Sequence, residues 1–166
     1  MLKPLALLTV VFALLLAAPA GAVIVPGKGM AGAHLGQSIE SVVAQIGYPD
    51  KTFGKTEPTG EFVETYYYDK LGFKIRFYHG AGGSLVAGEF FTAASKERTA
   101  EGVGKRTSRR ILKKKLKHVK CETFRQGKRK IRSCHIGRFT PSKRVTEFRM
   151  TSKWRVGTIS VRYVSD

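Results

Sequence analysis

From position 38 onward, apolar residues recur three and four positions apart. Four of them fall on one face of a helix at this spacing: Ile39, Val42, Val43 and Ile46. Ser38 is a suitable N-cap, and Gly47 followed by Pro49 ends the helix. This stretch therefore predicts a short helix, which is stable only when it packs on the rest of the fold.

A period of two replaces the helical period after position 60. Residues 61–68 and 71–78 are rich in aromatic and β-branched side chains and are separated by Asp69-Lys70, which predicts a β-hairpin. Residues 84–92 predict a third strand, and the polar stretch 51–60 predicts a loop. The consecutive residues Tyr66, Tyr67 and Tyr68 must point to both faces of their strand, so we expect at least one in the core and at least one displayed.

A similar series recurs in the second half. Thr107 predicts an N-cap, and the apolar face after it consists of Ile111, Leu112 and Leu116. A hairpin about Gly127 and two more strands, 144–151 and 155–164, follow. The spacing from cap to apolar face is the same in both helices, which is typical of a divergent internal repeat.

The chain thus predicts an α+β fold. Two divergent repeats, each a short helix followed by antiparallel strands, form one shared sheet with the helices on one face. The predicted segments are a glycine-rich N-terminal segment at 23–33, the first repeat at 34–92, a linker at 93–102, and the second repeat at 103–166. Within the first of these, residues 23–26 can form a short strand and residues 27–32 are expected to be flexible.

Residues 1–22 are typical of a secretory signal peptide. Lys3 precedes an apolar run over 5–16, and the small residues at 19–22 predict cleavage after Ala22. The run is short for a membrane span, although an uncleaved anchor is the alternative. We therefore expect a secreted or extracytoplasmic protein that is associated with the cell envelope.

Charge is distributed unevenly along the chain. Residues 23–102 contain 8 Lys and Arg against 9 Asp and Glu, whereas residues 103–166 contain 21 against 3. This asymmetry favours attraction of the second repeat to an anionic surface or polymer and carries no information about the fold.

The chain has two cysteines, Cys121 and Cys134. Folding the chain about Gly127 and Lys128 brings the two together across a hairpin, and an isolated pair in an exported protein predicts a disulfide. His135 directly after Cys134 raises metal ligation as the alternative. Adjacent strand residues point to opposite faces and no C-x-x-C is present, so the sequence favours the disulfide.

The helix motif also carries a resemblance to a known family. Leu35-Gly36-Gln37-Ser38, Val42 and Ile46-Gly47-Tyr48-Pro49, followed by a tyrosine-rich strand pair, resemble the SmpA/OmlA-like motif. The tandem arrangement is similar to that of the β-lactamase-inhibitor-protein family, and also to that of secreted bacterial proteins with the same motifs and a late cysteine pair. The resemblance implies a tandem α/β repeat. The chain departs from the pattern because it has no lipid-attachment cysteine and its second copy lacks the Gly-x-Pro stop.

No arrangement of residues predicts catalysis. Residues 27–32 match G-x-G-x-x-G, but no long βαβ unit surrounds them. The four histidines, His34, His79, His118 and His135, lie in four segments without metal-ligand spacing. We therefore expect a non-enzymatic protein without a cofactor or metal.

The strongest indication of function is the basic second repeat, which predicts binding to a polyanion. The alternative is a cationic surface that is only solvated and has no specific partner. The candidate polyanion-binding residues are Arg106, Arg110, Lys113 and Lys117 on the second helix and Lys128, Arg129 and Lys130 at the hairpin tip. We expect an anionic envelope polymer or an acidic protein surface as partner, and no sequence-specific nucleic-acid binding, because no recognition motif is present.

A second hypothesis is that the protein inhibits or scaffolds a secreted protein through its tandem sheet. Tyr66, Tyr67 and Tyr68 would then be the anchors, because tyrosine is enriched at the energetic centres of protein interfaces.

Overall fold

The computed structural model describes residues 23–80 and 82–165 of the chain. The predicted signal peptide lies outside the described residues. The described part forms two sheets and two short helices, α1 (Ile39–Ile46) and α2 (Arg109–Lys115).

The larger sheet has eight antiparallel strands. In chain order these are β4 (Lys51–Thr56), β5 (Phe62–Tyr68), β6 (Phe73–His79), β7 (Leu85–Thr92), β9 (Lys120–Gln126), β10 (Arg129–Gly137), β11 (Arg144–Met150) and β12 (Val156–Tyr163). Their order across the sheet is β4-β5-β6-β7-β12-β11-β10-β9, so the two halves of the chain meet where β7 pairs with β12. The prediction of a chain rich in antiparallel strands is confirmed.

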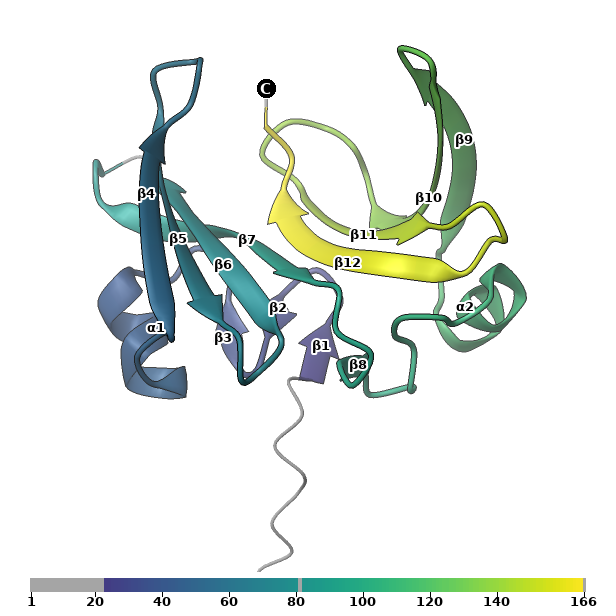
Figure 1. Cartoon of the computed structure of the whole chain (residues 1–166), viewed down its shortest axis with the longest axis horizontal. Coiled ribbons are helices and arrows are strands. Elements are labelled where there is room, and N and C mark those ends of the chain that lie inside the picture. The colour runs from purple at the N-terminus through teal and green to yellow at the C-terminus, as the bar shows by residue number, and fades with distance from the viewer. Residues whose placement is uncertain (1–22, 81, 166) are drawn as a thin grey trace, which may run out of the picture.

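The smaller sheet has four strands in the order β3-β2-β1-β8. They are β1 (Val23–Val25), β2 (Gly29–Met30), β3 (Ala33–His34) and β8 (Arg98–Thr99). Figure 1 shows the larger sheet bent like a U, with α1, α2 and the smaller sheet outside the bend. We call the concave side of the larger sheet its inner face and the convex side its outer face.

The first helix forms as its sequence predicts. The Ser38 hydroxyl accepts a hydrogen bond from the Ser41 N–H at 3.3 Å, and the Gly47 N–H donates to the Val43 carbonyl at 2.8 Å. Gly47 has a φ of 85°, a conformation that suits glycine at a helix end. Val42 is fully buried, so its side of the helix faces the core.

The predicted start of the second helix is wrong by one residue. Ser108 is the N-cap instead of Thr107, and its hydroxyl accepts from the Ile111 N–H at 3.4 Å. The Thr107 carbonyl accepts from the Val156 N–H at 2.9 Å, which fixes this segment as extended chain. With the cap at Ser108, Leu112 is fully buried and Ile111 is 41% exposed, so the prediction of Ile111 on the core face is wrong.

The two helices are preceded by matching backbone contacts. The Gly36 N–H donates to the Ala87 carbonyl of β7 at 2.8 Å, and the Arg106 N–H donates to the Val156 carbonyl of β12 at 2.7 Å. Gly36 and Arg106 each lie two residues before a cap and have positive φ values, 88° and 70°. Each helix is thus anchored to one of the two central strands.

Two further expectations are wrong. Part of the predicted loop 51–60 is β4, which pairs with β5 from Lys51 opposite Tyr67 to Thr56 opposite Phe62. The glycine-rich residues 27–32 are ordered instead of flexible, since they contain β2 and the fully buried Met30, whereas the short strand expected at 23–26 is present as β1. The predicted linker contains β8, which pairs in parallel with β1.

The core lies between the outer face of the sheet and the elements that cover it. Buried sheet residues such as Ile75, Phe90 and Phe148 pack in one cluster with Val42 of α1 and Leu112 of α2. Because the core is on the outer side, every second residue of each central strand is left to face the inner side.

Candidate functional site

The inner face of the sheet is polar along its centre. Phe73, Ile75 and Phe77 of β6 are buried, so the alternating Lys74, Arg76 and Tyr78 project from the other side. The strand register extends this polar surface across the sheet. Arg76 lies opposite Glu89 of β7, and Glu89 lies opposite Arg162 of β12. Further along β12, Ser160 lies opposite Glu147 of β11.

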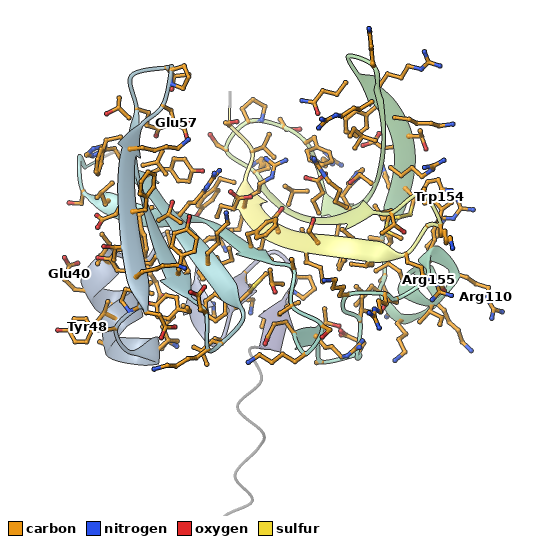
Figure 2. All side chains as sticks on the ribbon, viewed as in Figure 1. Glu40, Tyr48, Glu57, Arg110, Trp154 and Arg155 are labelled. Carbon is orange, nitrogen blue, oxygen red and sulfur yellow. A yellow bond between two sulfur atoms is a disulfide. The ribbon has the colours of Figure 1, made fainter. Side chains whose placement is uncertain are left out.

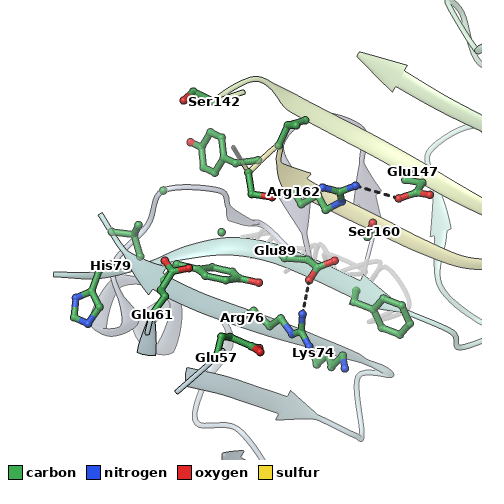
Figure 3. A pocket seen from close by; sticks show the side chains of 18 of the residues that line it. Glu57, Glu61, Lys74, Arg76, His79, Glu89, Ser142, Glu147, Ser160 and Arg162 are labelled. Carbon is green, nitrogen blue, oxygen red and sulfur yellow. Dashed lines mark hydrogen bonds and ion pairs between the residues drawn. The ribbon is translucent and has the colours of Figure 1, made fainter. Parts of the chain in front are cut away.

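Two ion-pair groups occupy this surface (Figure 3). Arg76 and Glu89 approach to 3.4 Å on the first half. On the second half the buried carboxylate of Glu147 lies 3.3 Å from Arg162 and 3.5 Å from Arg149 and accepts a hydrogen bond from the Ser133 hydroxyl at 3.0 Å. Two guanidinium groups and a hydroxyl donor thus compensate the buried negative charge of Glu147.

These groups line a cleft of about 1360 Å³. Its floor contains Lys74, whose ammonium lies 5.0 Å from the centre of the Phe91 ring and 5.7 Å from that of Tyr67. Burial, followed by the neighbouring Glu89 carboxylate, raises the pKa of Tyr78. The cleft is larger than the pockets of about 300–1,000 Å³ that hold small molecules.

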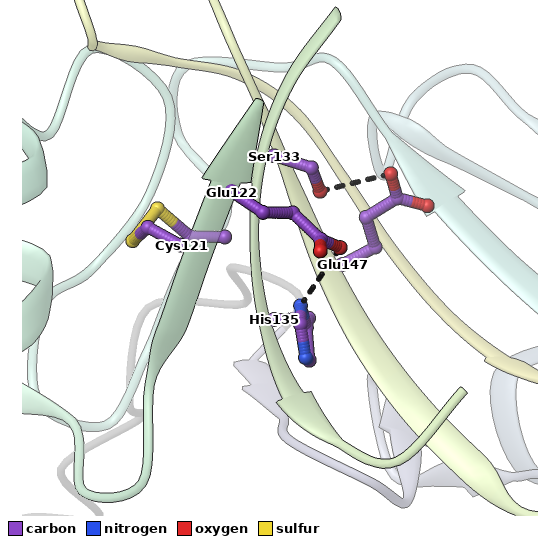
Figure 4. The surroundings of a disulfide bond; sticks show 6 residues. Cys121, Glu122, Ser133, His135 and Glu147 are labelled. Carbon is purple, nitrogen blue, oxygen red and sulfur yellow. Dashed lines mark hydrogen bonds and ion pairs between the residues drawn. A yellow bond between two sulfur atoms is a disulfide. The ribbon is translucent and has the colours of Figure 1, made fainter. Parts of the chain in front are cut away.

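The disulfide lies on the opposite side of the β9–β10 hairpin. Cys121 and Cys134 are directly opposite in the register and are joined, as predicted. Figure 4 shows the sulfur atoms on one side of the hairpin and Glu122, Ser133, His135 and Glu147 on the other. His135 is 7% exposed, and its Nδ1 lies 3.7 Å from a Glu122 carboxylate oxygen.

The outer surface of the second half is basic and carries no carboxylate from residues 103–165. Between 103 and 165 the chain has two acidic residues, Glu122 and Glu147, and both face the inner side. Strand alternation puts the outer residues of the hairpin on the same side as the disulfide. We call this surface the basic face and define it as Arg109, Arg110, Lys113, Lys114, Arg125, Lys130, Arg132 and Arg155.

Trp154 lies beside Arg109 and Arg132 of the basic face, in the turn between β11 and β12. Its ring centre is 4.5 Å from the guanidinium carbon of Arg109 and 5.8 Å from that of Arg132. Figure 2 shows Trp154 and Arg155 at the same end of the molecule as Arg110. The sequence did not single out this cluster, because its three members come from α2, β10 and a turn.

The structure separates the predicted polyanion-binding residues. Arg110 and Lys113 are exposed on α2, and Lys130 lies on the outer side of β10. Arg106 and Lys117 are exposed but lie before and after α2, so the prediction that they are on the second helix is wrong. Lys128 is at the hairpin tip, and Arg129, which alternates with Lys130, points to the inner side.

The tyrosine anchors of the alternative hypothesis are also separated. Tyr68 is 2% exposed and donates from its hydroxyl to the Gly47 carbonyl at 3.2 Å, so the prediction that it is a surface anchor is wrong. Tyr66 and Tyr67 are half-buried on opposite faces, and Tyr67 is the one on the inner face.

No group of three or more His, Cys, Asp and Glu side chains within 23–80 and 82–165 is arranged to hold a metal ion. Neither α1 nor α2, the helices of the described part, is long and apolar enough to cross a membrane.

No protein-family model, curated protein or solved structure matches the chain.

Proposed function

We propose that this protein binds an anionic polymer of the cell envelope or extracellular space through the basic face, and that it acts as a binding protein without catalysis. The supporting observation is the absence of acidic side chains on this surface within the described residues 103–165. Cations without carboxylate neighbours gain more from a polyanion than paired ones, because no ion pair has to be broken first.

The extent of this surface favours a polymer over a single small anion. Its cations come from α2, the β9–β10 hairpin and Arg155, which lies directly before β12. A polyanion that spans these elements contacts several of them at once and releases one condensed counterion for each contact. Export through the predicted signal peptide makes wall polymers, anionic lipid headgroups and released nucleic acid the available partners.

The test is the salt dependence of binding to immobilised polyphosphate. With about four contacts, affinity should fall about a hundredfold between 50 and 200 mM salt, since the logarithm of affinity falls linearly with that of salt. Salt-insensitive binding, or no binding to any polyanion at low salt, contradicts the proposal.

A pair of double variants locates the surface. Lys113→Glu with Lys114→Glu reverses two charges on α2, and we expect it to weaken binding at low salt at least about tenfold. Lys28→Glu with Lys70→Glu makes the same net change at exposed positions of the first half and should bind within about twofold of the unchanged protein.

The inner cleft supports a second candidate function, the capture of a secreted protein partner. Its volume of about 1360 Å³ and its charges of both signs suit an inserted protein segment better than a small molecule. A partner retained from the secreted fraction at high salt, lost with Lys74→Glu and kept with Lys113→Glu, would favour this function over polyanion binding.

We also propose that the two halves are divergent copies of one unit, as the SmpA/OmlA-like resemblance implies. The supporting observation is the matching pair of contacts made by Gly36 with Ala87 and by Arg106 with Val156.

A further inference from the structure

We infer that Arg109, Arg132 and Trp154 form a phosphate-binding site within the basic face, and that the polymer this protein binds is therefore one that carries phosphate groups. The inference rests on the proposed function and names the chemistry of its ligand.

Trp154 holds both guanidinium groups in place. The centre of its ring lies 4.5 Å from Cζ of Arg109 and 5.8 Å from Cζ of Arg132, within the range of cation–π attraction. The two guanidinium groups are consequently no further apart than the sum of these distances. An arginine already ordered against an aromatic ring loses less side-chain entropy when it binds a ligand than a free one does.

The backbone around Trp154 fixes the ring relative to α2. The Trp154 carbonyl accepts from the Arg109 N–H at 3.0 Å, and the Trp154 N–H donates to the Thr151 carbonyl at 3.0 Å. The first bond connects the β11–β12 turn to the first residue of the helix that carries Arg109, and the second lies within the turn itself.

Trp154 also occupies an unfavourable backbone conformation. Its φ is 54°, in the left-handed region that favours glycine, asparagine and aspartate over bulky residues. A bulky aromatic residue at such a position indicates that the ring itself has a role, because strained backbone concentrates at functional sites.

The two arginines are available to a ligand. Neither guanidinium takes part in any of the ion pairs or side-chain hydrogen bonds of the described residues. A guanidinium stacked on a ring keeps its N–H edges free to form paired hydrogen bonds with an oxyanion. A carboxylate accepts hydrogen bonds mainly in its own plane, whereas the oxygens of a tetrahedral phosphate accept from directions all around the group, so a phosphate suits two guanidinium groups that come from different elements.

The test compares polyphosphate with polyglutamate of similar charge. Trp154 is the single tryptophan of the chain, so its fluorescence reports directly on the site. We expect polyphosphate to change the emission saturably and polyglutamate to leave it nearly unchanged at concentrations where both are bound. Equal changes with both polymers, or none with either while polyphosphate is bound, contradict the inference.

Charge-conserving variants provide the second measurement. Arg109→Lys with Arg132→Lys keeps the net charge and removes the planar donors, so polyphosphate affinity should fall about tenfold and polyglutamate affinity less than twofold. The matched control is Arg110→Lys with Arg125→Lys, which should leave both affinities within about twofold. Circular dichroism confirms that both double variants are folded.

The outcomes distinguish this site from the proposed function. Full polyphosphate affinity in Arg109→Lys/Arg132→Lys, together with loss in Lys113→Glu/Lys114→Glu, removes the phosphate site and leaves polyanion binding intact. Failure of the unchanged protein to bind either polymer overturns both.

Discussion

Replacing Glu147 with glutamine tests whether the inner-face network stabilises the fold independently of the basic face. Glu147 is 7% exposed and is surrounded by the Ser133 hydroxyl and the guanidinium groups of Arg149 and Arg162. Glutamine keeps the shape of the side chain and one acceptor oxygen but removes the negative charge. Arg162 then loses the carboxylate it contacts.

The contacts bound the size of the effect. The side chain of Arg149 is 52% exposed, so its pair with Glu147 contributes no more than about 1 kcal/mol. The side chain of Arg162 is 27% exposed, and breaking a fully buried pair costs about 3–5 kcal/mol, so this partly buried pair contributes less. We therefore expect Glu147→Gln to lower the free energy of unfolding by about 2 kcal/mol in total.

Urea unfolding followed by far-ultraviolet circular dichroism measures this change. The matched control is Glu122→Gln, because the side chain of Glu122 is 51% exposed and its loss should cost less than about 0.5 kcal/mol. Polyphosphate affinity should stay within about twofold in both variants, since both residues face away from the basic face. Equal unfolding free energies for the two variants would refute the assigned role of the network.

Three further predictions concern stability. Burial raises the pKa of Tyr68 to about 12, so the protonated hydroxyl stabilises the fold below pH 10. This contribution of about 2 kcal/mol to the free energy of unfolding is lost as pH rises towards 12. In denaturant titrations at increasing pH, Tyr68→Phe should remove this part of the loss of stability. The disulfide closes a sequence separation of 13 residues, and Cys121→Ser with Cys134→Ser should lower stability by about 3 kcal/mol, whereas an unchanged melting temperature would contradict this. Leu112→Ala should cost about 2–5 kcal/mol and Ile111→Ala less than about 1 kcal/mol, because Leu112 is fully buried and Ile111 is 41% exposed; similar costs would show that α2 is packed on a different face.

Local signals explain which elements the sequence predicts correctly. The first helix carries its cap, apolar face and stop within a dozen residues, and each acts on its immediate neighbours. The β9–β10 hairpin is equally local, since a turn at Gly127 fixes the register that joins Cys121 to Cys134.

The wrong predictions concern elements whose structure depends on contacts between residues far apart in the sequence. β4 was predicted as a loop because KTFGKT shows no apolar alternation, and it needs none at the edge of the sheet, where all six residues are exposed. Thr107 and Ser108 are both good caps, and the choice between them depends on the hydrogen bonds of Arg106 and Thr107 with Val156, which lies far along the chain.

The sequence does not predict the candidate sites either, because their residues come from distant parts of the chain. The alternation on β6 predicts that Lys74 and Arg76 face water, but their surroundings come from strands that the sequence alone does not pair. The cluster of Trp154 with Arg109 and Arg132 depends on a turn, a helix and a strand that meet only in the folded chain. Net charge indicated the correct half of the molecule, whereas the arrangement of that charge required the fold.

The two helices show where folding leaves the sequence free to specify binding. Val42 and Leu112 occupy the same position after their caps and are both fully buried, so packing requires an apolar residue at each. The exposed positions differ completely: α1 has one acidic residue, Glu40, and no basic residue, whereas α2 (Arg109–Lys115) has five basic residues and no acidic one. Five cations on seven residues repel one another, so an anion bound beside them should stabilise this helix. Polyphosphate should therefore raise the unfolding temperature, and this stabilisation should be lost together with binding in Lys113→Glu/Lys114→Glu.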